Sequence, residues 1–365
     1  MLKSRGFWIG IIVSVVFIGL FVRSTDFGEV KRAFEDANYW WVAISMPVYF
    51  VGLWVRTVRW QYLLRPVKRV PALRLFPVVI VGLMANNLMP ARTGEFVRAY
   101  ALGARERVSK SSALGTIAVD RLFDGLTLVP MMFIVALFAG RDVELPVGFG
   151  RELSFAGLSA VMTALFGAAL LVLLVLVFSM RARDGLHRLV HRLAPGNLKP
   201  KVEEILQSFF TGLESLRSPV DLSAAWIMSA LSWALEATMY YLVARGFGIH
   251  EPFHVFLLLT AAANLAIAVV ASQGGVGPFE LVVSKTVVAF GASSKLASAY
   301  AIGLHAVLLF PIIVIGLYLM WTMKLTFGDM LKSSDRGDDT PPSSAEQEPG
   351  GRVLRSGATA KPERA

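Results

Sequence analysis

The chain has 365 residues, of which 55% are hydrophobic and only 17% are charged, and its mean hydropathy is +0.59. In soluble domains about a quarter of the residues are charged, and apolar residues recur periodically rather than in unbroken runs. The apolar runs of this chain, such as 165–180 and 307–323, instead predict membrane spans. This composition excludes a cytosolic enzyme, a nucleic-acid-binding domain and a secreted scaffold, and no nucleic acid is expected as a partner.

The formal net charge is +10, and the chain contains no cysteine. In a membrane protein, an excess of lysine and arginine more often marks cytoplasmic loops that face anionic lipid. The absence of cysteine excludes a disulfide framework, thiol catalysis and a thiolate metal site.

The first two predicted spans, 6–22 and 39–55, place the N-terminus in the cytoplasm. The first span follows Lys3 and Arg5, and because no small-residue cleavage pattern comes after it, we interpret it as a retained span rather than a signal peptide. The second span opens with three aromatic residues, which are typical of an interfacial anchor. A basic run without acidic residues follows it and predicts a cytoplasmic loop: Arg56, Arg59, Arg65, Lys68, Arg69 and Arg74.

The next apolar segment, 75–90, is short for a span and ends at Pro90. A second basic stretch follows at 92–110, and two successive basic loops cannot both be cytoplasmic if one full span separates them. We therefore predict a re-entrant hairpin that enters from the cytoplasm and turns near Pro90, followed by an outward span at 113–139. Irregular backbone at membrane depth is tolerated only inside protein or beside a water-filled cavity.

The second half of the chain predicts the same order of segments with every direction reversed. Spans are expected at 153–180, 220–243 and 296–323, and an external hairpin at 253–290 is interrupted by a glycine-rich turn. Residues 181–218 are basic and amphipathic, and they either lie on the inner leaflet or pack as a helical hairpin on the protein itself.

Together these segments predict an all-α polytopic membrane protein with about six full spans and two re-entrant hairpins. Residues 1–140 and 141–325 are expected to form two repeats of inverted topology, with 181–218 as a cytoplasmic segment of the second. Interrupted helices at corresponding places in such repeats indicate a transport site at the membrane midplane. Residues 326–365 lack an apolar face and predict a disordered cytoplasmic tail.

The first group of candidate site residues surrounds the turn of the first hairpin. A proline kinks or ends the incoming helix there, and a glycine permits close backbone approach. Arg92 and Arg98 carry planar guanidinium groups suited to a phosphodiester, and Glu95, three residues from both, is placed to orient either of them. The alternative is an interfacial turn with a structural ion pair. The candidate substrate-binding residues of this turn are Asn86, Asn87, Arg92, Glu95 and Arg98.

Two further groups lie in the fourth predicted span and in the second hairpin. Asp120 and Asp124 share a helical face with Arg121 beside them, and they either complete the anion site, close a gate, or form a salt-bridged helix end. In the second hairpin, three glycines precede a helix that starts at a proline, so backbone N–H groups are expected to be free for an anion. The candidates in this turn are Gln273, Gly274, Gly275, Gly277 and Glu280.

Glu236 is the last candidate substrate-binding residue, because a carboxylate in the middle of a span must be protonated or matched to an arginine. Lys285, His305 and Asn264 lie at similar depth, where an interhelical hydrogen bond is the commoner outcome. The sequence contains no metal-ligand spacing, nucleophile elbow or phosphate loop. No catalytic residue, metal or cofactor is therefore expected, and the chain is predicted not to be an enzyme.

The blocks at 86–98, 120–124 and 274–280 resemble, in residue content and order, the transmembrane flippase-like module of lysylphosphatidylglycerol synthases. The resemblance covers about residues 5–325. It implies movement of a lipid between the leaflets of a prokaryotic plasma membrane. In two-domain members this lipid is an aminoacylated phosphatidylglycerol, made by a soluble aminoacyl-transferase domain. Because only the predicted tail follows residue 323, we expect the free-standing form, which does not synthesise the lipid.

We therefore expect a translocase for an anionic or aminoacylated phospholipid, or for a polyprenyl-phosphate-linked lipid, with both termini in the cytoplasm. In this hypothesis Arg92 and Arg98 bind phosphate, while Glu95 and Asp124 orient the arginines. The alternatives are a membrane-embedded transferase with Glu95 and Asp120 as acid and base, a non-catalytic partner of a separate lipid-modifying enzyme, and a small-solute secondary transporter. Homo-oligomerisation is left open by the sequence.

Overall fold

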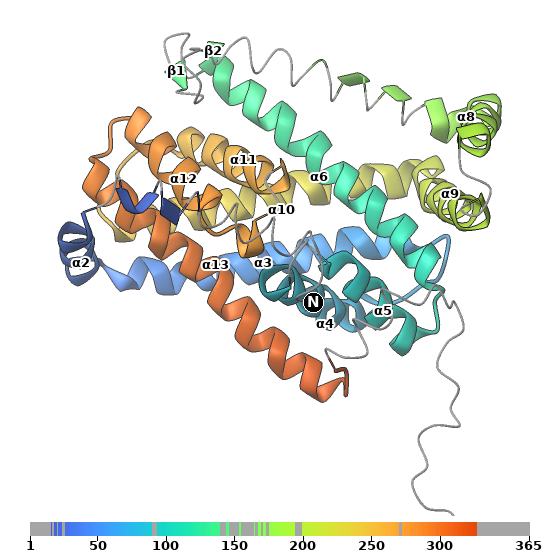
Figure 1. Ribbon diagram of the computed structural model, residues 1–365, viewed down its shortest axis with the longest axis horizontal. Coiled ribbons are helices and arrows are strands. Elements are labelled where there is room, and N and C mark those ends of the chain that lie inside the picture. The colour runs from blue at the N-terminus through green and yellow to red at the C-terminus, as the bar shows by residue number, and fades with distance from the viewer. Residues whose placement is uncertain are drawn as a thin grey trace, which may run out of the picture.

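The described residues of the computed structural model are almost entirely helical (Figure 1). The exception is a short antiparallel pairing of β1 (Glu144–Leu145) with β2 (Leu153–Ser154). The structure describes residues 16, 18–19, 21–23, 26–89, 93–138, 144–145, 153–154, 164, 167–168, 171–172, 175–193, 199–269 and 272–326.

The helices of the first half are α2 (Phe27–Glu35), α3 (Tyr39–Leu64), α4 (Ala72–Leu88), α5 (Gly94–Glu106) and α6 (Lys110–Phe138). Those of the second half are α8 (Met180–Leu193), α9 (Lys199–Glu214), α10 (Pro219–Gly246), α11 (Phe253–Val269), α12 (Pro278–Ala289) and α13 (Ser294–Thr322). Two 3-10 turns, η2 (Ser215–Arg217) and η3 (Gln273–Gly275), precede α10 and α12.

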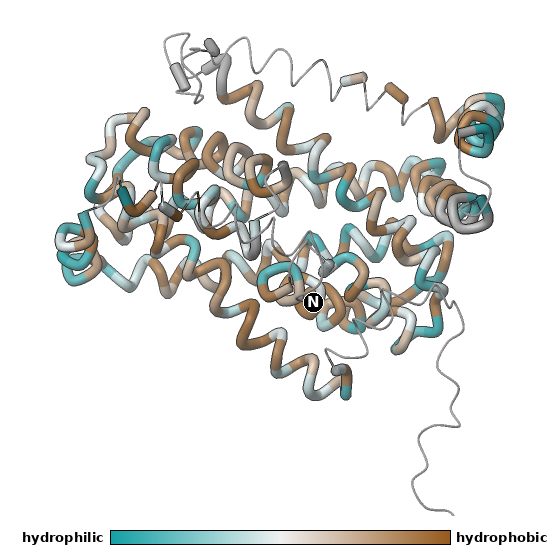
Figure 2. The backbone as a smooth tube through the Cα atoms, viewed as in Figure 1, coloured by the Kyte–Doolittle hydropathy of each residue, from teal (hydrophilic) through white to brown (hydrophobic). Residues whose placement is uncertain are grey.

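Three of these helices, α3, α10 and α13, are long and apolar enough to cross a membrane. Helix α6 has 29 residues, so at about 1.5 Å per residue it also exceeds a hydrocarbon core of about 30 Å. Figure 2 shows the hydrophobic character of α13 along its length. The prediction of an all-α membrane protein is thus confirmed. The predicted spans 6–22 and 153–180 and the predicted tail 326–365 lie largely or wholly outside the described residues.

The two predicted hairpins are pairs of short helices that pack against each other, α4 with α5 and α11 with α12. Their arms have 12 to 17 residues, or about 18–26 Å, which is too short for a full crossing. The two hairpins touch at their tips: a methyl group added to Gly274 would lie 3.1 Å from the Asn87 carbonyl oxygen. This contact places the irregular backbone at Gly274 inside the protein, as the bilayer requires.

Helices α3 and α10 form a central antiparallel pair. The Asn38 N–H donates to the Gly246 carbonyl at 2.8 Å at one end, and Arg65 pairs with Asp221 at 2.5 Å at the other. Six further contacts occur as three matching pairs: α4 with α13 and α11 with α6, α5 with α6 and α12 with α13, α3 with α4 and α10 with α11. This correspondence supports the predicted inverted repeat, which itself remains a prediction.

The predicted cytoplasmic loop after residue 55 begins later than expected. Arg56 and Arg59 lie inside α3 and are buried, with 7% and 0% of their surfaces exposed. The helix continues through both arginines because acidic side chains on neighbouring helices neutralise them, so the charges do not need water. The assignment of these two residues to a loop is therefore wrong, whereas Arg65 and the residues after it do lie at the end of the helix.

The segment 181–218 contains α8, α9 and η2, and α9 packs on α6. A methyl group on Gly212 would lie 3.0 Å from the Gly115 carbonyl, so the two backbones are in close contact. Of the two alternatives for this segment, packing on the protein therefore holds for α9. Helix α8 is joined to α9 by a 2.8 Å contact between His187 Nε2 and Glu203 Oε1, and this hydrogen bond lowers the pKa of Glu203.

Candidate functional site

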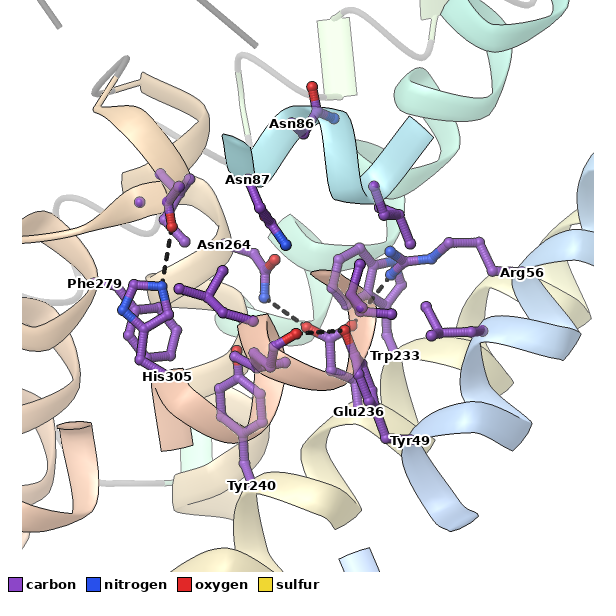
Figure 3. Close-up of a pocket in the computed structure, with 18 of the residues that line it drawn as sticks. Tyr49, Arg56, Asn86, Asn87, Trp233, Glu236, Tyr240, Asn264, Phe279 and His305 are labelled. Atoms are coloured by element: carbon purple, nitrogen blue, oxygen red, sulfur yellow. Dashed lines mark hydrogen bonds and ion pairs between the residues drawn. The ribbon is translucent and has the colours of Figure 1, made fainter. Parts of the chain in front are cut away.

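A cavity of about 150 Å³ lies between the central helix pair and the tips of the two hairpins (Figure 3). Such a volume admits several water molecules or a small polar group. Its wall combines polar side chains with aromatic ones. The polar ones are Arg56, Asn86, Asn87, Arg121, Glu236, Asn264, Ser272 and His305, and the aromatic ones are Tyr49, Trp233, Tyr240 and Phe279.

Arg56 on α3 and Glu236 on α10 form an ion pair in the wall of this cavity. The Arg56 Nη2 atom lies 3.3 Å from Glu236 Oε2, and Asn264 on α11 donates to Glu236 Oε1 at 3.0 Å. The Arg56 guanidinium also lies over the Trp233 ring, 4.4 Å from its centroid. Figure 3 shows these side chains pointing toward one another from three helices. Glu236 was expected to be either protonated or paired with an arginine, and the structure places Arg56 beside it.

Arg59, one helical turn further along α3, is the centre of a second and deeper group of charges. It contacts Asp120 at 2.7 Å and Asp124 at 2.8 Å, both on α6, and it donates to Ser229 Oγ on α10 at 2.9 Å. The side chains of Arg59 and Asp120 have no exposed surface. Charges at this depth are tolerated only when they are paired and hydrogen-bonded, so this group ties α3, α6 and α10 together.

Arg98 on α5 belongs to the same charged group. Its Nη1 atom donates to Asp120 Oδ2 at 2.9 Å, and its guanidinium lies 3.6 Å from the centroid of the Trp60 ring. The prediction that Glu95 orients Arg98 is wrong: Glu95 accepts a hydrogen bond from Asn86 at 3.2 Å. Glu95 lies in the first turn of α5 at the hairpin tip, where it faces the Asn86 amide, whereas the facing helix α6 presents Asp120 directly to the guanidinium.

Arg121 on α6 lines both the main cavity and a smaller one. It lies 3.2 Å from Asp124 Oδ2 and 3.6 Å from Asp120 Oδ2, and about a third of its side chain is exposed. The smaller cavity, about 10 Å³, is lined by Glu95, Arg98 and Arg121 and has room for one water molecule. Among the described residues, Arg98 Nε and Nη2 and Arg121 Nε have no hydrogen-bond partner. These nitrogens are buried donors without a partner, and both arginines line the smaller cavity.

The tip of the first hairpin is held by Asn86. Its side-chain oxygen accepts the Gly94 N–H at 2.8 Å, which joins the end of α4 to the start of α5. Asn86 thus points toward its own hairpin, whereas Asn87 points toward the cavity in Figure 3. Arg92 lies outside the described residues.

The tip of the second hairpin has left-handed backbone at Gly274, Gly275 and Gly277, with φ of 62°, 79° and 96°. The Gly277 N–H donates to Glu280 Oε2 at 2.7 Å, and the Gly275 N–H lies 3.4 Å from the Ser272 carbonyl. The expectation that the N–H groups of this turn are free is therefore wrong at these two positions. The side chain of Glu280, in the first turn of α12, caps the turn instead, as in a capping box.

The candidate residues thus divide by place. The main cavity is lined by Asn86, Asn87, Arg121, Glu236, Gly274 and Gly275. Glu95 and Arg98 line the smaller cavity, with Asp120 and Asp124 bound to the arginines around it. Gly277 and Glu280 brace the second tip, and the backbone of Gln273 lies in η3.

Two charged residues of this region, Arg56 and Arg59, were not among the site residues predicted from the sequence. The signal was present, because Asp120, Asp124 and Glu236 are three acids inside apolar runs that each require a cation. Arg56 and Arg59 are three residues apart and so share one helical face, and they directly follow an apolar run. His305 and Asn264 do form the interhelical hydrogen bonds expected of them.

The fold and site define a class: a multi-pass α-helical membrane protein in which two opposed hairpins meet beside a polar cavity lined by arginine, asparagine and glutamate. The sequence matches the family described as the lysylphosphatidylglycerol synthase TM region over residues 7–316. The chain therefore belongs to this family.

The chain is also similar to several archaeal proteins. It is 29% identical to a UPF0104 membrane protein of Methanothermobacter thermautotrophicus over 62% of this chain and 67% of the relative. A second UPF0104 membrane protein of that organism is 25% identical over 73% of this chain and 80% of the relative. Glycosyltransferase AglD of Haloferax volcanii is 25% identical over 74% of this chain, a match that covers only 47% of the enzyme.

Proposed function

We propose that this protein moves a lipid with a phosphate-containing headgroup between the two leaflets of the membrane. The headgroup passes through the main cavity while the acyl chains stay in the bilayer. Candidate cargoes are an anionic or aminoacylated phospholipid and a polyprenyl-phosphate-linked lipid. The observation that carries the proposal is the polar cavity at the contact of the two hairpin tips, with arginine in its wall.

The main physical support for this proposal is the free-energy cost of placing ionised side chains inside the bilayer. Ionised side chains are expensive inside a bilayer, and those that occur there commonly line a substrate pathway. Here Arg98 is held by Asp120 of the facing helix α6 and Arg121 by Asp124 of its own helix, and nitrogens of both arginines lack partners among the described residues. Guanidinium groups bind phosphate oxygens through parallel hydrogen bonds. The family description, which names a lipid synthase, points to the same class of ligand.

Within this proposal the residues have different roles. Arg121 meets the headgroup at the wall of the main cavity. Arg92 and Arg98 are proposed as further phosphate ligands. Asp120 and Asp124 hold the guanidinium groups in place. Asn87 and Glu236 offer hydrogen bonds to the polar part of the headgroup.

The alternative of a transferase, favoured by the similarity to AglD, needs a carboxylate pair that faces substrate. Asp120 does not meet this requirement, because Oδ1 is bound by Arg59 and Oδ2 by Arg98, and its side chain has no exposed surface. Glu95 and Asp120 as acid and base are therefore not supported, and lipid translocation is the function we favour.

The test is leaflet exchange of fluorescent phosphatidylglycerol in liposomes that contain the purified chain. We expect a membrane-impermeant quencher to reach nearly all of the label with wild-type protein, but only the outer leaflet in protein-free liposomes. Arg121→Gln should slow exchange at least about tenfold, since one charge-assisted contact to phosphate is lost.

The matched control is Arg32→Gln, which removes an exposed arginine of α2 far from the cavity and should exchange lipid like wild type. Equal rates for wild type and Arg121→Gln would remove the proposed role of Arg121. Wild-type liposomes that behave like protein-free ones would contradict lipid translocation and favour a non-catalytic partner or a small-solute transporter.

A further inference from the structure

His305 lies on α13 beside the tip of the second hairpin and is almost completely buried, with 5% of its surface exposed. Its ring packs on Phe279, 4.4 Å between centroids, and it belongs to the wall of the main cavity. Its Nδ1 atom is 2.6 Å from Glu280 Oε1 on α12, and its Nε2 atom is 3.0 Å from the Gly274 carbonyl oxygen. Both ring nitrogens thus face oxygen atoms.

The number of protons in this arrangement follows from the chemistry of the partners. A carbonyl oxygen only accepts hydrogen bonds, and so does an ionised carboxylate, whereas a neutral imidazole has one N–H. Neutral histidine next to ionised Glu280 would therefore leave one nitrogen lone pair against an oxygen lone pair. Both contacts are satisfied only if the pair holds one more proton, either on the imidazole or on the Glu280 carboxyl group.

We infer that His305 and Glu280 form a proton-binding site that couples the movement of an anionic headgroup through the cavity to the movement of a proton in the same direction. This inference rests on the proposed function. The pair is neutral overall with the proton and carries one negative charge without it. In an interior of low dielectric constant that difference acts strongly on a second anion nearby. An anionic headgroup therefore binds better to the protonated site, and by reciprocity it also raises the affinity of the site for the proton.

Other charged and titratable groups also lie around the cavity, but Glu280 is the acid that contacts His305. It belongs to α12, and Lys285 on the same helix is exposed. Helix α4 contributes only the amides Asn86 and Asn87, and the α2 carboxylate that pairs with α13, Glu29, lies at Lys295 near the start of that helix. The remaining groups line the cavity from α3, α6 and α10: Tyr49, Arg56, Arg121, Glu236 and Tyr240.

The proton also determines whether His305 holds the tip of the second hairpin by one hydrogen bond or by two. Without it, the remaining imidazole N–H stays with the charged Glu280 carboxylate, because that hydrogen bond is the stronger one. The contact to Gly274 is then lost, and Gly274 is the residue that touches Asn87 of the first hairpin. Loss of the proton thus removes one of the two hydrogen bonds by which His305 holds the second tip against α13.

The test uses liposomes that contain the full chain and short-chain fluorescent phosphatidylglycerol, with a pH difference of about one unit imposed in either direction. Extraction of the label by albumin reports its share in the outer leaflet. We expect the label to accumulate in the leaflet on the alkaline side, approaching about tenfold for one proton per lipid, and to reverse with the gradient. Protein-free liposomes under the same gradients give the background.

The outcomes separate the coupling from the proposed function. If the protein accelerates exchange but the label distributes equally under both gradients, proton coupling is overturned and translocation stands. If the protein accelerates nothing under any condition, translocation fails and the coupling fails with it.

A binding measurement assigns the proton to the pair without requiring transport. For the wild-type chain in detergent, the affinity for dihexanoyl-phosphatidylglycerol should fall by up to about tenfold per pH unit as the pair loses its proton. In His305→Gln and in Glu280→Gln this dependence should disappear. The exposed His250→Gln is the control and should behave like wild type. Wild-type pH dependence in both His305→Gln and Glu280→Gln would overturn the assignment.

Discussion

At the scale of single residues, the dominant feature is the set of arginines and acids around Asp120. This carboxylate accepts from Arg59 and Arg98, lies 3.6 Å from Arg121, and has no exposed surface. Such a group does not have to be more stable than an apolar one, but loss of one member leaves another charge buried without compensation. The group therefore specifies how α3, α5 and α6 meet more than it adds stability.

We accordingly expect Asp120→Asn to lower the free energy of unfolding in detergent by about 3–5 kcal/mol, because two buried guanidinium groups lose their shared counter-charge. Denaturant or thermal unfolding followed by circular dichroism measures the change. The control is Asp36→Asn at the exposed C-terminal end of α2, which should unfold like wild type. A variant at Asp120 as stable as the control would mean that the pairing is not needed for stability.

At the scale of elements, the first hairpin depends on two glycines where its arms approach. A methyl group on Gly82 would lie 3.0 Å from Arg98 Cβ, and one on Gly94 would clash with the Gly82 carbonyl oxygen and lie 2.5 Å from the Asn86 side chain. The second distance is shorter than real contacts allow. The turn is thus closed by a glycine opposite an asparagine, which also accepts the Gly94 N–H.

Gly94→Ala should therefore displace Asn86 and destabilise the hairpin by about 1–3 kcal/mol, the usual cost of overpacking. It should also slow leaflet exchange, because the tip carries candidate ligands. The control is Gly185→Ala on α8, where an added methyl group meets nothing within 4 Å, and this variant should be neutral or slightly more stable. The melting temperature and the rate of leaflet exchange are measured on both variants. A wild-type melting temperature and a wild-type exchange rate in Gly94→Ala would show that the tip can rearrange without cost.

At the scale of the whole molecule, the chain has two distinct ends. One end holds the ion pairs of Arg65 with Asp221 and of Lys68 with Glu106, and the other holds the pair of Glu29 with Lys295. The first hairpin opens toward the former end and the second toward the latter, which is the arrangement of an inverted repeat. Because the former end is rich in arginine and lysine, we propose that it faces the cytoplasm.

This sidedness can be tested directly because the chain has no cysteine. Single cysteines at the exposed positions Asp36 and Arg69 are expected to lie on opposite faces of the membrane. A membrane-impermeant maleimide should label Asp36→Cys in intact cells, whereas Arg69→Cys should react only after permeabilisation. Labelling of both variants from the same side would contradict the assigned topology and the inverted repeat.

The sequence by itself determined the membrane class, the helical content and the places where the two hairpins turn. Long apolar runs, a proline and a group of glycines are local features, and each acts on the backbone within a few residues of itself. The spans 113–139, 220–243 and 296–323 accordingly lie within a few residues of α6, α10 and α13.

Only the tertiary structure decided which charges pair and what the turns contact. Arg59 meets Asp120 across 61 residues of chain, and Arg56 meets Glu236 across 180. Local spacing suggested that Glu95 would pair with Arg98, but Asp120 on the facing helix α6 does so. It also suggested free N–H groups in the glycine turn, but Glu280 accepts a hydrogen bond from the Gly277 N–H. Burial is the physical reason: a charge removed from water binds whichever opposite group the packing brings closest, and separation along the chain carries no information about that.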